Sequence, residues 1–225
     1  MEKTRMIDQE EMEGVICLSW DAKEKGALGV VKSALDNSHN PFVAFSGGKR
    51  SLVLLDMARR SGSGKLNVLH VETGAEFERA LSYTDKIRRL WGLNLQRLPS
   101  KGILPFPGNR LECCRKLILE PLEDATARYE IDCLLIGSAG GDKCWQELLG
   151  SSENNKCDRV YPLLHFTDED IWAYIEGHNL PFCSLYNQGF QSVDCKPCSE
   201  SVAAERTGAE EEALIKERLK KLGYI

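Results

Sequence analysis

Residues 42–60 read FVAFSGGKRSLVLLDMARR, and this stretch indicates the fold class. FVAF (42–45) is a short apolar run of the kind found in buried strands. A glycine turn follows, and then Leu52, Leu55 and Ala58 recur at helical spacing. A strand that passes through glycines into a helix is typical of α/β proteins.

The rest of the chain repeats this alternation. Strand-like runs follow at 66–71, 93–98 and 132–138, and helical patterns at 77–91, 113–129 and 167–177. Thr167 and Asp170 form a capping pattern before the last of these helices, and SSENNKCDR (151–159) reads as a polar loop. Strands alternating with crossover helices predict a single α/β domain, with a mainly parallel twisted sheet flanked by helices. We divide the chain into an N-terminal helical segment, a nucleotide-binding domain and a C-terminal helix, at 1–40, 41–200 and 201–225.

Composition excludes several classes of protein. The chain has 225 residues, 42% hydrophobic and 28% charged, as in an ordinary globular domain. No apolar run approaches the length of about eighteen residues needed to span a membrane. The first residues, MEKTRMIDQEEMEG, lack the apolar core of a secretory signal, so we expect a cytoplasmic protein. The net charge of −5 gives no general attraction to nucleic acid or anionic membranes, so an anion must be bound locally.

The glycine turn SGGKRS (46–51) is the first candidate site. Gly47 and Gly48 allow the backbone to approach a ligand closely, and the helix N-terminus offers N–H groups and partial positive charge. Ser46, Lys49 and Ser51 add side-chain donors. Because parallel sheets bind ligands at the carboxyl ends of their strands, the loops 72–76 and 137–145 are expected at the same edge.

Four of the nine cysteines form two tight pairs. Cys113 and Cys114 are adjacent, and Cys195 and Cys198 form a C-x-x-C pair. In a reducing compartment such pairs indicate metal ligands or reactive thiols rather than disulfides. They could hold zinc or an iron–sulfur cluster, and a vicinal pair suits the separate irons of a cluster better than one tetrahedral ion.

Several motifs together carry a family resemblance. FSGGKRS resembles the SGGxDS loop of the PP-loop, or adenine nucleotide alpha-hydrolase-like, superfamily. LHVETGAEFERALSYTDKI resembles the DTGxxFPETxxY segment of phosphoadenylyl-sulfate and adenylyl-sulfate reductases. CCR at 113–115 with Pro121 and Leu122 resembles their cluster motif, and residues 161–198 resemble the segment that ends in their C-x-x-C pair. The resemblance covers roughly residues 41–200.

The resemblance implies an adenine nucleotide ligand with a sulfur-bearing group, a 4Fe-4S cluster and a thioredoxin-like thiol donor. The implied cluster ligands are Cys113, Cys114, Cys195 and Cys198. The implied nucleotide or phosphate contacts are Ser46, Gly47, Gly48, Lys49, Arg50, Ser51, Glu72, Thr73, Gly74, Asp142 and Lys143.

The sequence also departs from the family. Arg50 replaces the usual Asp of SGGxDS, which argues against magnesium-dependent pyrophosphate release. The Arg-Lys pair of the cluster motif falls on Leu117 and Ile118, and the basic RRDQS loop falls on GGDKCW (140–145). No cysteine follows Cys198, so the C-terminal Glu-Cys-Gly-x-His nucleophile motif is absent. Cys144, beside Lys143, is the candidate replacement.

Three hypotheses follow from these observations. The first is a sulfonucleotide-reductase-like iron–sulfur enzyme that acts in sulfur metabolism. The second is an ATP-dependent thiolation enzyme of the same superfamily, for which a nucleic acid would be the substrate. The third is a non-catalytic nucleotide-binding or redox module. The sequence leaves the electron donor and homo-oligomerisation open.

Overall fold

The computed structural model describes residues 19–62, 64–100, 110–138 and 157–199, together with Glu217 and Lys220. The strands are β1 (Pro41–Ala44), β2 (Asn67–Glu72), β3 (Asn94–Pro99), β4 (Cys133–Leu135) and β5 (Asp158–Val160). The helices are α2 (Trp20–Asn37), α3 (Lys49–Ser61), α4 (Glu78–Leu90), α5 (Arg110–Cys114), α6 (Glu120–Arg128) and α8 (Asp168–Gly177). A π-helical segment, Arg115–Leu119, joins α5 to α6, and a 3-10 turn, Tyr186–Gln188, follows α8.

The five strands form one parallel sheet in the order β3-β2-β1-β4-β5. The chain moves from β1 outward to β2 and β3, and later returns to the other side of β1 with β4 and β5. The direction of winding therefore changes between β1 and β4. Open α/β sheets bind their ligands at such a point, outside the carboxyl ends of the two strands.

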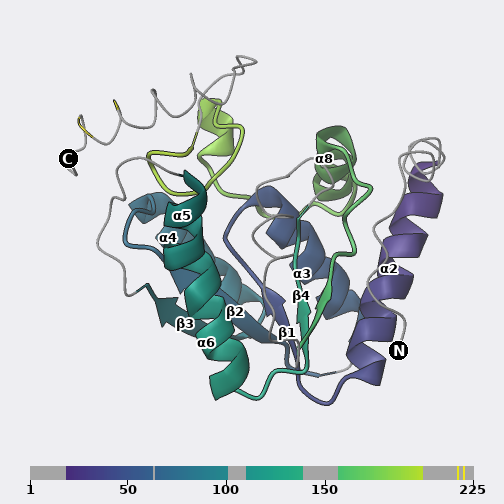
Figure 1. Ribbon diagram of the computed structural model, residues 1–225. Coiled ribbons are helices and arrows are strands. Elements are labelled where there is room, and N and C mark those ends of the chain that lie inside the picture. Colours follow the sequence, from purple (N-terminus) through teal and green to yellow (C-terminus); the bar gives the residue numbers. More distant parts are fainter. Residues whose placement is uncertain are drawn as a thin grey trace.

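Helices cover both faces of the sheet (Figure 1). On one face, Val43, Phe45 and Val68 pack with side chains of α2, α3, α4 and α8. On the other face, Phe42 and Leu69 pack against α6, which lies in front of the sheet in Figure 1. Successive strand residues thus enter opposite cores, as period-two geometry requires in a sheet that is covered on both sides.

Polar side chains hold the amino ends of the strands together. Asn94 donates to Asn67 Oδ1 over 2.7 Å, and Asn67 donates to Asn40 Oδ1 over 3.5 Å. Asp132 accepts the backbone N–H of His39 and of Asn40, at 2.6 and 3.0 Å. These bonds fix the strands relative to one another at the edge opposite to the glycine turn.

The predicted fold class is confirmed, and most predicted elements match within a few residues. The capping box of Thr167 and Asp170 at α8 is present. The assignment of residues 151–159 to a polar loop is wrong at its end, because Asp158–Val160 is an edge strand. Of the predicted terminal segments, α2 lies within 1–40, whereas residues 1–18 and nearly all of 201–225 lie outside the described residues. Among the described helices, none is long and apolar enough to cross a membrane.

Candidate functional site

The glycine turn lies between β1 and α3 and is organised by its own serines. Ser51 Oγ donates to Gly48 O over 2.9 Å and accepts from Ser46 N over 3.2 Å. Gly48 N donates to Ser46 Oγ over 3.3 Å. Gly47 has φ +86°, and a Cβ there would lie 3.1 Å from Thr84 Oγ1. The turn therefore requires glycine at position 47 and uses both hydroxyls to hold its shape.

The two cations that follow the turn share one carboxylate. Lys49 Nζ and Arg50 Nη2 contact different oxygens of Asp168, the first residue of α8, and the arginine contact is 2.9 Å long. Lys49 also donates to Gln191 O over 3.0 Å and lies 5.3 Å from the centre of the Trp172 ring. Sequence analysis predicted both cations to meet a ligand anion, and here both are bound to the protein's own carboxylate.

Tyr186 lies over the start of α3. Its hydroxyl accepts the backbone N–H of Lys49 over 2.8 Å, and it lies 3.6 Å from the position a Cβ would occupy on Gly48. Burial raises the pKa of the Tyr186 hydroxyl. The phenol oxygen of Tyr186 thus accepts a hydrogen bond from one of the backbone N–H groups at this helix N-terminus.

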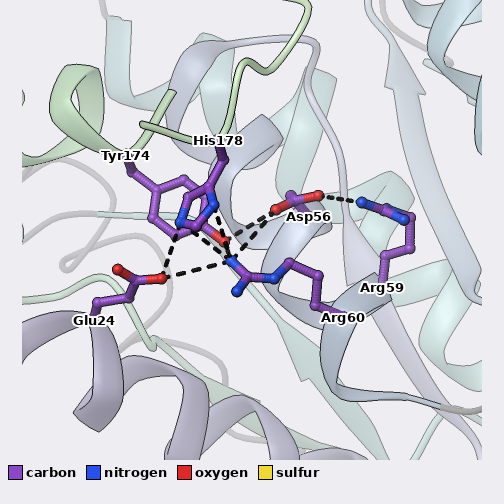
Figure 2. A network of polar contacts seen from close by, with 6 residues as sticks. All are labelled: Glu24, Asp56, Arg59, Arg60, Tyr174 and His178. Carbon is purple, nitrogen blue, oxygen red and sulfur yellow. Dashed lines mark hydrogen bonds and ion pairs between the residues drawn. The ribbon is translucent and has the colours of Figure 1, made fainter. Parts of the chain in front are cut away.

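A buried polar network fixes α8 against α3 and α2 (Figure 2). Tyr174 donates to Asp56 Oδ2 over 3.0 Å and accepts from Arg60 over 2.9 Å. His178 Nε2 lies 3.0 Å from Glu24 Oε1, which joins α2 to the network. Asp56 is only 1% exposed. Because this network locks α8 onto α3, it also determines where Asp168 lies relative to the glycine turn.

The end of β4 faces the glycine turn across the change in winding direction. A Cβ on Gly137 would lie 3.0 Å from Arg50 O and 3.1 Å from Ser51 Cα, so only glycine allows this approach. Ser138 Oγ is buried and has no hydrogen-bond partner among the described residues. The predicted residues Asp142, Lys143 and Cys144 follow shortly after and lie outside the described residues.

Buried polar groups lie beneath the turn. His70, 2% exposed, lies with Nδ1 2.7 Å from Phe45 O. Burial lowers the pKa of this histidine. Its Nε2, like Thr84 Oγ1, is buried without a partner in the described part of the chain. The histidine thus contacts the backbone just before the turn.

The loop after β2 is held by a glutamate that sequence analysis missed. Glu76 accepts hydrogen bonds from Thr73 Oγ1 at 2.8 Å and from Gly74 N at 3.0 Å. The predicted Glu72 instead pairs with Arg97 of β3. The spacing of Thr73 and Glu76, three residues apart, was the available signal, because a carboxylate at that distance can cap a tight turn.

The C-x-x-C pair packs on this same loop. Cys195 Sγ lies 3.2 Å from Thr73 Oγ1, and Lys196 N donates to Ala75 O over 2.8 Å. Burial raises the pKa of the Cys195 thiol. The segment from Tyr186 to Ser199 therefore extends from the glycine turn to the loop after β2. We call it the bridging segment.

The vicinal pair Cys113–Cys114 ends α5, directly before the π-helical segment Arg115–Leu119. π-helical turns are rare and are frequent at functional sites. The helix α5, which ends at this pair, lies toward the carboxyl ends of the strands in Figure 1. The side chains of all four cysteines are partly exposed, and four cysteine thiolates are the ligand set that an iron–sulfur cluster takes. Within the described ranges, however, no three His, Cys, Asp or Glu side chains gather at metal-ligand spacing.

Comparison with known proteins shows the family to which this fold and these motifs belong. Residues 40–201 match the family model described as phosphoadenosine phosphosulfate reductase domain. An adenosine 5'-phosphosulfate reductase of Bacillus velezensis is 28% identical in an alignment of 202 positions that covers 83% of this chain and 85% of that protein. An uncharacterized protein of Methanocaldococcus jannaschii is also 28% identical, over 83% of this chain, and the chain spans only 41% of its length.

Among solved structures, phosphoadenylyl-sulfate reductase from Candida auris superposes with a TM-score of 0.61 at 17% sequence identity. The match covers 89% of this chain and 100% of that one. At this identity the likeness concerns the fold.

Proposed function

Because the chain belongs to the phosphoadenosine phosphosulfate reductase domain family, we propose that it binds a sulfonucleotide, such as adenylyl sulfate or phosphoadenylyl sulfate, at the SGGKRS turn. We further propose that it is a sulfonucleotide-reductase-like iron–sulfur protein of sulfur metabolism.

One observation carries the nucleotide part of the proposal. The glycine turn opens α3 at the change in winding direction, and Gly137 lets the β4 end pack directly on the backbone of Arg50 and Ser51. A helix N-terminus at such a point offers N–H groups and partial positive charge to an anion. The phosphate or sulfate end of the nucleotide would lie there.

The cluster part of the proposal depends on the four paired cysteines. Cys113, Cys114, Cys195 and Cys198 supply the thiolates that a 4Fe-4S cluster requires. When bound, such a cluster would supply a compact charged group to the site. Thr73 Oγ1 lies 3.2 Å from Cys195 Sγ and helps to position this sulfur against the loop after β2.

The reduction itself needs a thiolate. It would attack the sulfur of the ligand, form an S–S bond and release AMP, or its 3'-phosphate, as the O–S bond breaks. A thioredoxin-like dithiol would then attack the protein sulfur, form a disulfide and release sulfite. Cys144 is our proposed nucleophile, because Lys143 beside it favours the thiolate and the cluster cysteines are committed to iron.

The test is an anaerobic incubation of the full chain, in turn with adenylyl sulfate, phosphoadenylyl sulfate and ATP, in the presence of thioredoxin. Sulfite from a sulfonucleotide supports the proposal, and Cys144→Ser should abolish it without changing nucleotide affinity. Pyrophosphate or AMP formed from ATP with an acceptor would indicate thiolation instead. Binding without turnover would indicate a non-catalytic module.

Iron and inorganic sulfide are measured on the same preparation. About four irons and four sulfides per chain are expected for one cluster. Cys198→Ser should lower both, whereas Cys183→Ser, which changes a buried cysteine outside the two pairs, should leave both unchanged. Stoichiometric zinc without sulfide would contradict the cluster.

A further inference from the structure

Asp168 is the only described carboxylate bound by both cations of the glycine turn, and sequence analysis gave it no role. It is the first residue of α8 and lies 118 residues beyond Arg50 in the chain. Its side chain is 42% exposed, whereas that of Lys49 is 8% exposed. The carboxylate is therefore held at the border between the buried lysine and solvent.

The two oxygens of Asp168 are both engaged. One contacts Lys49 Nζ, and the other accepts from Arg50 Nη2 over 2.9 Å. Lys49 is held further by Gln191 O and by the Trp172 ring, and Arg50 by Phe166 O at 3.4 Å. Two positive charges and one negative charge leave one net positive charge beside the start of α3.

We propose that Asp168 is a positioning residue that sets the charge preference of the anion site. It holds Lys49 and Arg50 beside the turn and cancels one of their charges, so that the site discriminates less in favour of highly charged anions than two unpaired cations would. This inference rests on the proposed nucleotide binding at the turn and adds which class of nucleotide is selected. The presence of Asp168 lets a terminal sulfate or a single phosphate compete better against a polyphosphate chain.

The physical reason is that Coulomb energy scales with the product of the charges. Neutralising Asp168 raises the net charge beside the turn, and the resulting gain in affinity grows with the charge of the ligand. AMP, ADP and ATP form a suitable series, because their charge increases while the nucleoside stays the same. A residue that only stabilised the fold would change all three affinities by a similar factor.

The experiment measures dissociation constants of AMP, ADP and ATP by calorimetry, with the full chain in EDTA at low salt. In Asp168→Asn the ratio of ATP to AMP affinity should rise about tenfold over that of the parent. Asp168→Glu keeps the carboxylate and should retain the parent ratio. Glu169→Gln is the matched control, because it removes an exposed carboxylate from the same helical turn.

Arg50→Gln gives the opposite test and does not depend on the folding of Asp168→Asn. It removes one cation, so the ratio of ATP to AMP affinity should fall below that of the parent. An unchanged ratio in both variants, or an equal rise in Glu169→Gln, overturns the role of Asp168. If the parent binds none of the three nucleotides, the proposed nucleotide function fails as well, and this outcome is distinct from an unchanged ratio.

Discussion

At the scale of single residues, Gly137 shows how closely two loops approach at the candidate site. We expect Gly137→Ala to destabilise the protein by about 1–3 kcal/mol, because its Cβ would press on the backbone of Arg50 and Ser51 rather than on a movable side chain. Nucleotide affinity should fall with it, since the turn must shift. Urea unfolding and calorimetry measure the two effects.

The control for this substitution is Gly29→Ala in α2. A Cβ on Gly29 meets nothing within 4 Å. In an exposed helix this change should stabilise the protein by about 0.5–1 kcal/mol and leave nucleotide affinity unchanged. A neutral Gly137→Ala would show that the two loops separate easily.

Tyr174 tests the network that positions α8. Burial and the charge of Asp56 raise the pKa of its hydroxyl, so the group is a donor at neutral pH. Tyr174→Phe leaves the buried Asp56 without this donor and should cost about 1–3 kcal/mol. Tyr129→Phe, whose ring stacks on Phe42 at the other face of the sheet, should cost less than about 0.5 kcal/mol. Similar losses in both variants would contradict this assignment.

At the scale of elements, the start of α8 should make stability depend on pH. Burial alone would raise the pKa of Asp170, but hydrogen bonds from Lys23 and from Thr167 N outweigh it, and the pKa is lowered from 3.8. The stability that Asp170 contributes is therefore complete above pH 3.8 and is lost as pH falls through the lower, folded-state value.

The measurement is the free energy of unfolding against pH for the parent and Asp170→Asn. Their difference should be largest near neutral pH and shrink below pH 3.8. Lys23→Met should reduce the same pH dependence, because it removes the partner of the carboxylate at 2.7 Å. A difference that stays constant with pH would show that the charge of Asp170 contributes nothing.

Local patterns predicted these elements well where periodicity and capping agree. Thr167 and Asp170 marked the start of α8, and the apolar spacing after the glycine turn marked α3. The edge strand Asp158–Val160 was missed because its three residues carry almost no apolar signal. The π-helical turn after Cys114 was missed because it changes a hydrogen-bond pattern without interrupting the helical periodicity.

The sequence predicted which loops form the candidate site, but it did not predict which side chains contact one another there. Gly47 and Gly48 predicted the turn, because two successive glycines between a strand and a helix are typical of a tight turn. The Arg50–Asp168 pair joins residues 118 apart, and nothing local distinguishes Asp168 from its acidic neighbours. Trp172 packs against the core, and its ring also lies 5.3 Å from Lys49 Nζ, a contact that the sequence did not predict.

At the scale of the whole molecule, the bridging segment should connect the thiols to the anion site. Lys196→Pro removes the N–H that donates a hydrogen bond to Ala75 O. Such a bond contributes about 0.5–1.5 kcal/mol to the stability of the folded state. We expect AMP affinity at the glycine turn to fall several-fold. Lys196→Ala keeps the N–H and is the control. Equal affinities in the two variants would mean that the halves of the segment act independently.

The same segment carries Tyr186 at one end and Cys195 and Cys198 at the other. If an event at the thiols alters how tightly the nucleotide is held, thermodynamic linkage requires the nucleotide to alter metal affinity by the same factor. Nucleotide binding and metal binding would then each change the affinity for the other through one short stretch of backbone.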